Sequence, residues 1–485
     1  MKNYKTLINH IDIEIKNANF EKSAVSFTNL YRELICKNKE FRLLNREIYL
    51  EAAILARRLS LFKEGLALLK FYVYPRTKLK IIATAAEKVE YASLLSRLGL
   101  YNEAHRLLSG MTSKDYSKVH LLKGFSYITQ WDHEKAIQEL TIVTRQLNIE
   151  EYDKLIAKVN ILFSLCFQKK WIQAKTLGDQ LLKISSNKKS NILQSNILEA
   201  MSDIACNEKN FAEAKHFIQM SEDLINDKKG LDFLLIQKQK LVIDISENGL
   251  SQNNIDRLES LKKKFIQLSR FEVVRDLDLI LARYKGDLQL ALKIFATTPY
   301  KDFKSKIIDY FPKIKSIDTF DLLIHKKPTH IKKDLILDIQ NWQLRMSPVI
   351  FKLLLSLFKH GYSLPKLEDI FNFLYPSQNY DYEMASDRVY QQIKRLRQFL
   401  RTARIPLIIK VKHNRYFLTS KAHSTVYLRI KLHHDYLEEK ELKFKKYLIK
   451  ESLREEQVMN LSTKQICEIT KIHPRKVRRI KALKK

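Results

Sequence analysis

The stretch that decides the fold of the C-terminal third is Ser386–Leu418, SDRVYQQIKRLRQFLRTARIPLIIKVKHNRYFL. Ser386 and Asp387 favour the start of a helix there, because their side chains cap free backbone amides. Apolar residues then follow at helical spacing and predict one buried stripe, made of Val389, Ile393, Leu396 and Leu400.

The opposite face of this predicted helix is polar and basic. It carries Arg388, Gln391, Lys394, Arg395 and Gln398. Two short β-like runs follow, residues 407–411 and 416–418, joined by 412–415. A basic helix followed by a basic hairpin is typical of an element that enters a DNA major groove and lays a wing on the backbone.

The charge of the chain points to an anionic partner. The formal net charge is +33, and no acidic residue occurs from Arg388 to His434. A second basic run without acids, 471–485, closes the chain. Such clustering on particular helices favours nucleic acid over a generally basic surface, whereas the weaker N-terminal excess fits either reading.

The composition predicts a mainly helical protein. The chain of 485 residues contains only 9 Gly and 9 Pro, and sheets and irregular loops rely on both for turns. The four cysteines, Cys36, Cys166, Cys206 and Cys467, lie far apart and form no metal-binding or disulfide pattern. No signal peptide and no apolar run of membrane-spanning length is evident, so we expect a soluble cytoplasmic protein without a membrane partner.

Residues 1–296 show a recurring local pattern in which a large residue is followed three positions later by a small one. The small residues are Ser23, Gly65, Ala104, Ala136, Ala174, Ala214 and Ala291. A small residue lets two antiparallel helices approach closely. The distance along the sequence from Ala214 to Ala291 is nearly twice the distance between the other successive small residues, which predicts one degenerate unit near residue 250.

The pattern resembles the tetratricopeptide repeat (TPR), most clearly in Leu98-Gly99-Leu100-Tyr101-Asn102-Glu103-Ala104. The spacing exceeds the 34 residues of that family, so we expect an irregular TPR-like α-solenoid, with a plain helical bundle as the alternative. Such a solenoid implies a protein or peptide partner. Basic pairs such as Lys169-Lys170 fit an acidic partner or solvated loops.

A second domain follows a junction at 297–332, which three prolines interrupt. Residues 334–339 and 344–346 alternate as strands do, and 349–359 and 365–374 are predicted to be helical. The helix and hairpin of Ser386–Leu418 follow them in the chain. This order resembles the C-terminal winged-helix domain of OmpR-type bacterial transcription regulators. The landmarks are Leu344-Arg345-Met346-Ser347-Pro348, Leu374-Tyr375-Pro376, the helix from Arg388 and Arg415-Tyr416-Phe417-Leu418.

The resemblance places this domain at 333–420 and implies that its helix from Arg388 reads DNA, with Lys412 and Arg415 on the wing. The family often has Gly at the wing tip, where this chain has His413-Asn414-Arg415. Asn414 tolerates the left-handed backbone that such a turn needs. No phosphorylatable receiver domain precedes the winged helix.

Residues 421–485 predict a β-like run at 425–432, a charged helix at 435–457 and a second helix-turn-helix at 461–480. The second helix of that motif would expose Arg475, Arg478 and Arg479. A basic tail packed on the winged helix is the alternative.

The leading hypothesis is therefore a cytoplasmic, sequence-specific DNA-binding transcription regulator whose helical repeats act as a sensor or docking module. The rival is a TPR-type scaffold whose winged helix binds protein, or DNA without sequence preference. No catalytic motif, cofactor site or metal site is evident, so an enzyme is not expected. The sequence is compatible with either a monomer or an oligomer.

Overall fold

The computed structural model describes residues 3–432 with short gaps. The gaps are 17–19, 76–80, 186–190, 226, 229, 269, 326–334, 344, 360–361, 363, 413 and 421–424. Among the residues described, no helix is long and apolar enough to cross a membrane.

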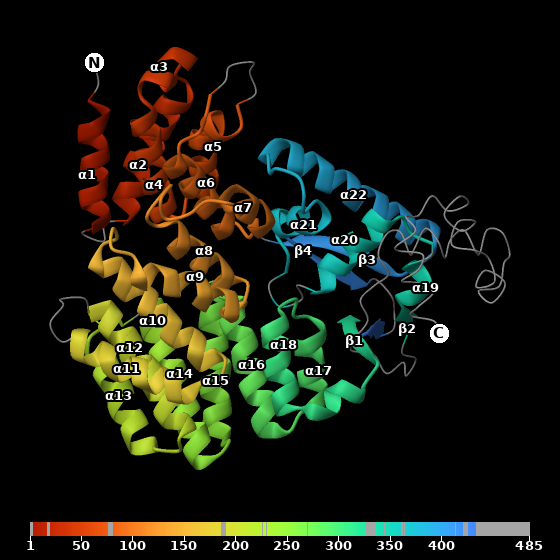
Figure 1. Ribbon diagram of the computed structural model, residues 1–485. Coiled ribbons are helices and arrows are strands. Elements are labelled where there is room, and N and C mark those ends of the chain that lie inside the picture. Colours follow the sequence, from red (N-terminus) through yellow and green to blue (C-terminus); the bar gives the residue numbers. More distant parts are fainter. Residues whose placement is uncertain are drawn as a thin grey trace, which may run out of the picture. The chain divides into compact units, whose positions relative to one another are not determined.

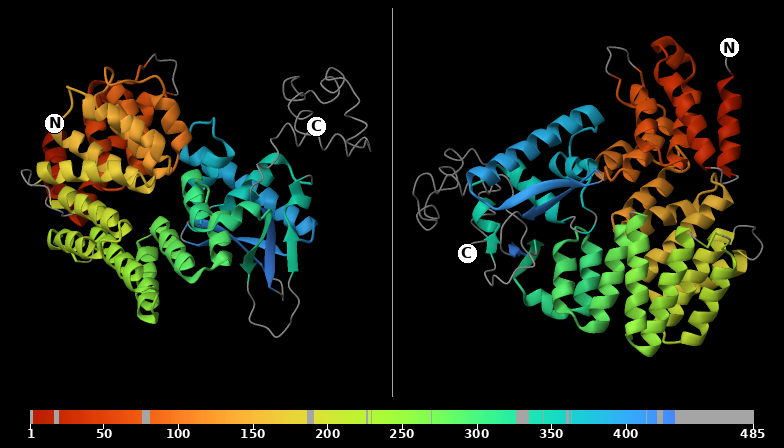
Figure 2. Two further views of the ribbon diagram at one scale, coloured as in Figure 1. Left: turned by 60° about the horizontal axis from the view of Figure 1, so that its bottom comes forward. Right: turned by 180° about the vertical axis from the view of Figure 1, so that it is seen from behind.

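The chain divides into two compact units (Figures 1 and 2). The first unit comprises Met1–Asp287, Tyr300–Lys306 and Tyr375–Ala385, and the second comprises Leu288–Pro299, Ile307–Leu374 and the chain from Ser386.

The first unit is built of consecutive antiparallel helices, as the ribbon in Figure 1 shows. They are α1 (Tyr4–Lys16), α2 (Phe20–Ile35), α3 (Lys39–Leu44), α4 (Arg46–Arg58), α5 (Phe62–Val73), α6 (Ala85–Arg97), α7 (Tyr101–Leu108), α8 (Val119–Thr129), α9 (His133–Arg145), α10 (Glu151–Phe167), α11 (Trp171–Ser185), α12 (Asn191–Asn207), α13 (Phe211–Asp223), α14 (Leu231–Asn248), α15 (Gln252–Gln267) and α16 (Phe271–Lys285). This confirms a mainly helical chain with helical repeats. Helices α14 and α15 form the hairpin expected near residue 250.

The same turn joins the two helices of successive hairpins. A backbone amide donates to a carbonyl five residues earlier, which is the longer bond of a Schellman C-cap. These amide–carbonyl pairs are Leu61–Ala56, Leu100–Leu95, Asp132–Tyr127, Lys170–Leu165, Asn210–Ala205 and Asp287–Ala282. The residue before each amide has a positive φ: Ser60, Gly99, Trp131, Lys169, Lys209 and Gly286. The repeat is therefore a property of the backbone that many residue types satisfy.

The small residues of the repeat are all buried, as predicted. Gly65 shows why a small residue is needed. A Cβ at this position would lie 2.9 Å from Leu94 Cδ2 and 3.2 Å from Ala56 Cβ. Helix α5 thus packs on α4 and α6 at a distance that only a glycine permits without rearrangement.

The second unit combines helices with two small sheets. Its helices are α17 (Leu288–Ala296), the end of α18 (Lys301–Tyr310), the 3-10 helix η1 (Pro312–Ser316), α19 (Gln340–Gln343), α20 (Pro348–Lys359), α21 (Leu367–Leu374) and most of α22 (Tyr382–Thr402). Its strands are β1 (Thr319–His325), β2 (Leu335–Asp338), β3 (Leu407–Lys412), β4 (Arg415–Ser420) and β5 (Val426–Lys431).

The larger sheet has the order β1-β5-β2, with β5 antiparallel to β1 and parallel to β2. Asp321 and Arg429 face each other across β1 and β5 and form two hydrogen bonds of 2.8 and 2.7 Å. Strand β5 is the β-like run predicted at 425–432. It supplies the central strand of a sheet that also contains β1 and β2, so the sheet draws on residues on both sides of 333–420.

Within the junction predicted at 297–332, the described residues form α18, η1 and β1 between Lys301 and His325. Phe303 and Ile307 are fully buried one helical turn apart, and Phe320 and Leu322 are buried at strand spacing. Pro299 precedes α18 and Pro312 is the first residue of η1, so neither of these prolines interrupts α18 or β1.

The prediction of a second strand at 344–346 is wrong for those of its residues that the structure describes. Residues 340–343 form α19 instead, and Met346 N donates to Trp342 O at 2.9 Å. Ile339, Trp342 and Met346 are all buried. Their spacing of three and four residues is helical, and it outweighed the alternation of the neighbouring sequence.

Candidate nucleic-acid interface

Helix α22 buries the apolar stripe that the sequence predicts. Val389, Ile393, Leu396 and Leu400 are each at most 2% exposed. The side chain of Arg397 ties the helix to the hairpin, because it donates to Ile409 O at 3.0 Å. Because this stripe is buried, the opposite face of α22 is the one exposed to solvent.

The helix begins at Tyr382, earlier than predicted. Asp381 precedes Tyr382 and accepts a bond from Met384 N at 3.4 Å, so Asp381 acts as the N-cap in place of Ser386. Ala385 is 1% exposed and lies one turn before Val389. The buried stripe therefore continues through Ala385, and this extra contact favours the earlier start.

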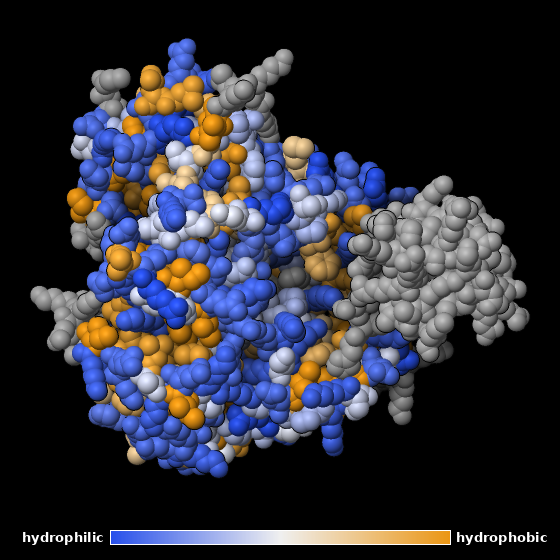
Figure 3. Space-filling model, viewed as in Figure 1, coloured by the Kyte–Doolittle hydropathy of each residue, from blue (hydrophilic) through white to orange (hydrophobic). Residues whose placement is uncertain are grey.

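The outward face of α22 is polar and basic. Gln391, Lys394, Arg395 and Gln398 are all exposed, and Figure 3 shows hydrophilic residues over this helix. Among the described residues, Lys394 and Arg395 form no ion pair. Arg388 is half-buried and already has an interaction within the protein. The face thus offers neutral amide groups together with the ammonium of Lys394 and the guanidinium of Arg395, and no described carboxylate pairs with these two charges.

The hairpin β3–β4 is anchored to the segment before α21. Tyr416 N donates to Pro365 O at 2.9 Å, and Lys366 forms a β-bridge with Arg415. Asn414 has a φ of 58°, which confirms the left-handed backbone expected at the tip. Burial raises the pKa of the Tyr416 hydroxyl to about 12, so this side chain stays neutral inside the unit.

The two predicted wing residues differ in their surroundings. Lys412 is exposed, whereas Arg415 is half-buried and donates to Leu364 O at 3.1 Å. Arg415 therefore helps to hold the hairpin, and its contact with DNA stays a prediction. The helix predicted at 435–457, the helix-turn-helix at 461–480 and its residues Arg475, Arg478 and Arg479 lie outside the described residues.

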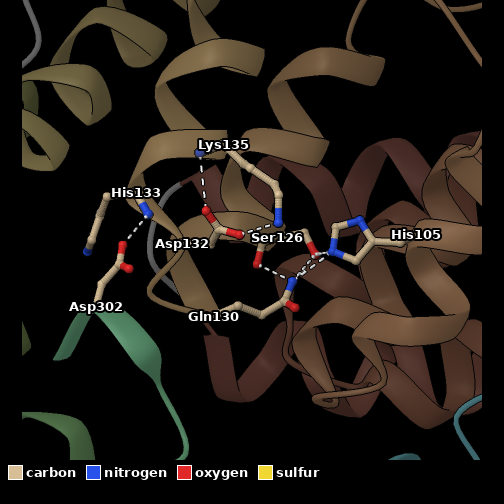
Figure 4. Close-up of polar contacts among 7 residues, drawn as sticks. All are labelled: His105, Ser126, Gln130, Asp132, His133, Lys135 and Asp302. Carbon is tan, nitrogen blue, oxygen red and sulfur yellow. Dashed lines mark hydrogen bonds and ion pairs between the residues drawn. The ribbon is translucent and has the colours of Figure 1, made fainter. Parts of the chain in front are cut away.

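A polar cluster in the repeats, which the sequence did not single out, is drawn in Figure 4. His105 Nε2 lies 2.7 Å from Gln130 Nε2, and burial lowers the pKa of His105. The neutral ring therefore accepts the amide bond. Asp132 pairs with Lys135 at 2.6 Å and also caps α9. These bonds stabilise the turn between α8 and α9.

Next to this cluster, His133 Nδ1 lies 3.3 Å from Ser164 Oγ. Both side chains are buried, and burial lowers the pKa of His133 to about 4. A substrate would not reach this pair, so we interpret it as a packing contact. No group of three potential metal ligands occurs in the described part of the chain.

No protein-family profile matches the chain, and none of the curated proteins matches it significantly. Among solved structures, the chain is similar to the apo form of RapI, with 14% identity and a TM-score of 0.39 over 64% of this chain and 98% of RapI. Membership of the OmpR-type family stays a prediction.

Proposed function

We propose that the chain is a sequence-specific DNA-binding transcription regulator. In this proposal α22 enters the major groove, the hairpin β3–β4 follows the neighbouring backbone, and the helical repeats hold a protein or peptide partner in the cytoplasm. The observation that carries it is the exposed row of glutamines and basic residues on α22, opposite a fully buried stripe.

The exposed side chains of α22 suit two kinds of DNA contact, with bases and with phosphates. Arg395 suits guanine, whose two acceptors match a guanidinium, and Gln391 and Gln398 suit adenine. Lys394 and Lys412 are point charges that favour phosphates. The phosphate contacts would place the helix, and the base contacts would supply the sequence preference.

Titration of the full chain against genomic DNA fragments at several salt concentrations tests this function. A preferred sequence that persists as salt rises is the expected result, because counterion release weakens all DNA binding but does not create a preference. Binding without sequence preference at every salt concentration would refute the regulator.

The second candidate is a protein-binding scaffold, which the repeated helical hairpins favour. Partners that remain bound after nuclease treatment, together with no enrichment of DNA in cells, would support it over the regulator.

A further inference from the structure

The loop that leads into α22 packs against the repeats. Residues Tyr375–Ala385 follow α21 in the chain, yet they belong to the first compact unit together with α5 and α7. The first turn of α22 is part of this segment, whereas Gln391, Lys394 and Arg395 come later on the same helix. Any residue that holds the segment therefore acts on the start of the candidate reading helix.

Glu103 on α7 makes the most buried of these contacts. Its Oε2 accepts a bond of 2.6 Å from Tyr380 N, and Glu103 and Tyr380 are 2% and 4% exposed. A buried carboxylate is costly unless hydrogen bonds compensate it. A backbone amide next to the N-cap is thus held by an acceptor from a distant repeat.

Arg106, one turn further along α7, holds the same loop from outside. Its guanidinium donates to the carbonyl oxygens of Pro376 and Gln378, the latter at 2.8 Å, and to Asn379 Oδ1 at 3.3 Å. The side chain is exposed, and it satisfies backbone acceptors that lie outside any helix or strand. This fixes the path of the chain before α22.

Helix α5 contributes two further contacts. Lys70 forms an ion pair with Asp381, the residue that caps α22 through Met384 N. Lys63 Nζ lies 4.3 Å from the centre of the Tyr382 ring, within the range of a cation–π interaction. The cap and the first helical residue of α22 are therefore both held by lysines of one repeat helix.

We propose that Glu103, Arg106 and Lys70 are positioning residues that hold the first turn of α22, so that the repeats control how well the reading helix is ordered. This inference rests on the proposed function of α22. A partner that shifts α5 or α7 would loosen the cap and change DNA affinity without touching DNA. Partner binding to the repeats and DNA binding by α22 would thus be coupled, although the partner does not touch α22.

The test compares Arg106→Ala with Arg145→Ala in the full chain. Both arginines are exposed in the first unit, and the Arg145 side chain forms no bond with another described residue, so the two variants lose the same charge. Hydrogen exchange of the Met384 and Ala385 amides should become about tenfold faster in Arg106→Ala alone, because several loop contacts are lost. Affinity for a preferred DNA site should fall about three- to tenfold, because ordering the helix start is then part of the cost of binding.

Glu103 supplies a second pair of variants. Glu103→Gln keeps an oxygen acceptor for Tyr380 N and should retain both exchange rate and affinity at neutral pH. Glu103→Leu removes the acceptor and should behave like Arg106→Ala. A thermal melt shows whether Glu103→Leu remains folded, and Arg106→Ala decides the question if it does not.

Exchange and affinity equal to those of Arg145→Ala would overturn the positioning role. Faster exchange with unchanged or higher affinity would overturn it as well, since the contact would then serve only loop packing or restraint. If the wild-type chain binds no DNA, the proposed function fails, and the exchange rates alone still decide whether the repeats hold the start of α22.

Discussion

The carboxyl group of Glu103 makes the stability of the repeats depend on pH in an unusual direction. Burial raises its pKa from 4.5 to about 7, although the Tyr380 amide, Tyr74 and Arg106 each act to lower it. The folded protein therefore binds a proton at Glu103 more tightly than the unfolded chain does. Between these two pKa values, folding stability contributed by this group falls as pH rises.

The substitution Glu103→Gln isolates the effect, because glutamine keeps the size and one acceptor but has no charge. One pKa unit corresponds to about 1.4 kcal/mol, so the free energy of unfolding of the Glu103→Gln variant relative to wild type should increase by about 2 to 3 kcal/mol between pH 5 and pH 8. Other carboxylates titrate in both proteins, and their contributions cancel in the difference.

Urea unfolding followed by the fluorescence of Trp131 and Trp171, with Trp342→Phe present in every protein compared, measures this difference in the repeat unit at both pH values. A difference that stays constant from pH 5 to pH 8, or that decreases, would refute the account of Glu103 as a buried, destabilising carboxylate. Arg145→Ala serves as the control, since it should show no such pH dependence.

Three further outcomes are expected. Gly65→Leu should destabilise the repeats by about 1–3 kcal/mol or more in urea unfolding, because its side chain would collide with Leu94 and Ala56. In urea unfolding of the second unit, Ile393→Ala should cost about 2–5 kcal/mol, whereas exposed Gln398→Ala should change stability by under about 0.5 kcal/mol. Arg395→Ala should weaken the preferred DNA site by about 1–3 kcal/mol and spare random DNA in gel-shift titrations, whereas Lys394→Ala should weaken both.

The repeats could be predicted because their signal is local. A small residue such as Ala104 or Ala174 must be buried wherever two helices cross closely, and each is fully buried. The stripe from Val389 to Leu400 was predictable for the same reason, since one helical period decides it. Asn414 at the hairpin tip followed from the conformational preference of a single residue type.

The contacts of Glu103 could not be predicted, because they join residues 277 positions apart. A glutamate on an amphipathic helix normally faces water, and nothing beside Glu103 in the sequence indicates a backbone donor from the loop before α22. The central place of β5 in its sheet has the same cause, since β1 pairs with it across a long stretch of intervening chain. Pairing between residues far apart in the chain produces no periodic pattern in the sequence.

Salt dependence separates the two proposed functions more sharply than affinity does. A chain with a net charge of +33 should bind any DNA at low salt, whichever function is correct, because counterion release favours every basic surface. A regulator must keep a difference between its preferred and random sites, since that difference arises from base contacts such as those proposed for Arg395. A scaffold would lose affinity for both sites in parallel. The ratio of the two affinities, followed as salt increases, is therefore the quantity that assigns α22 to DNA recognition or to charge alone.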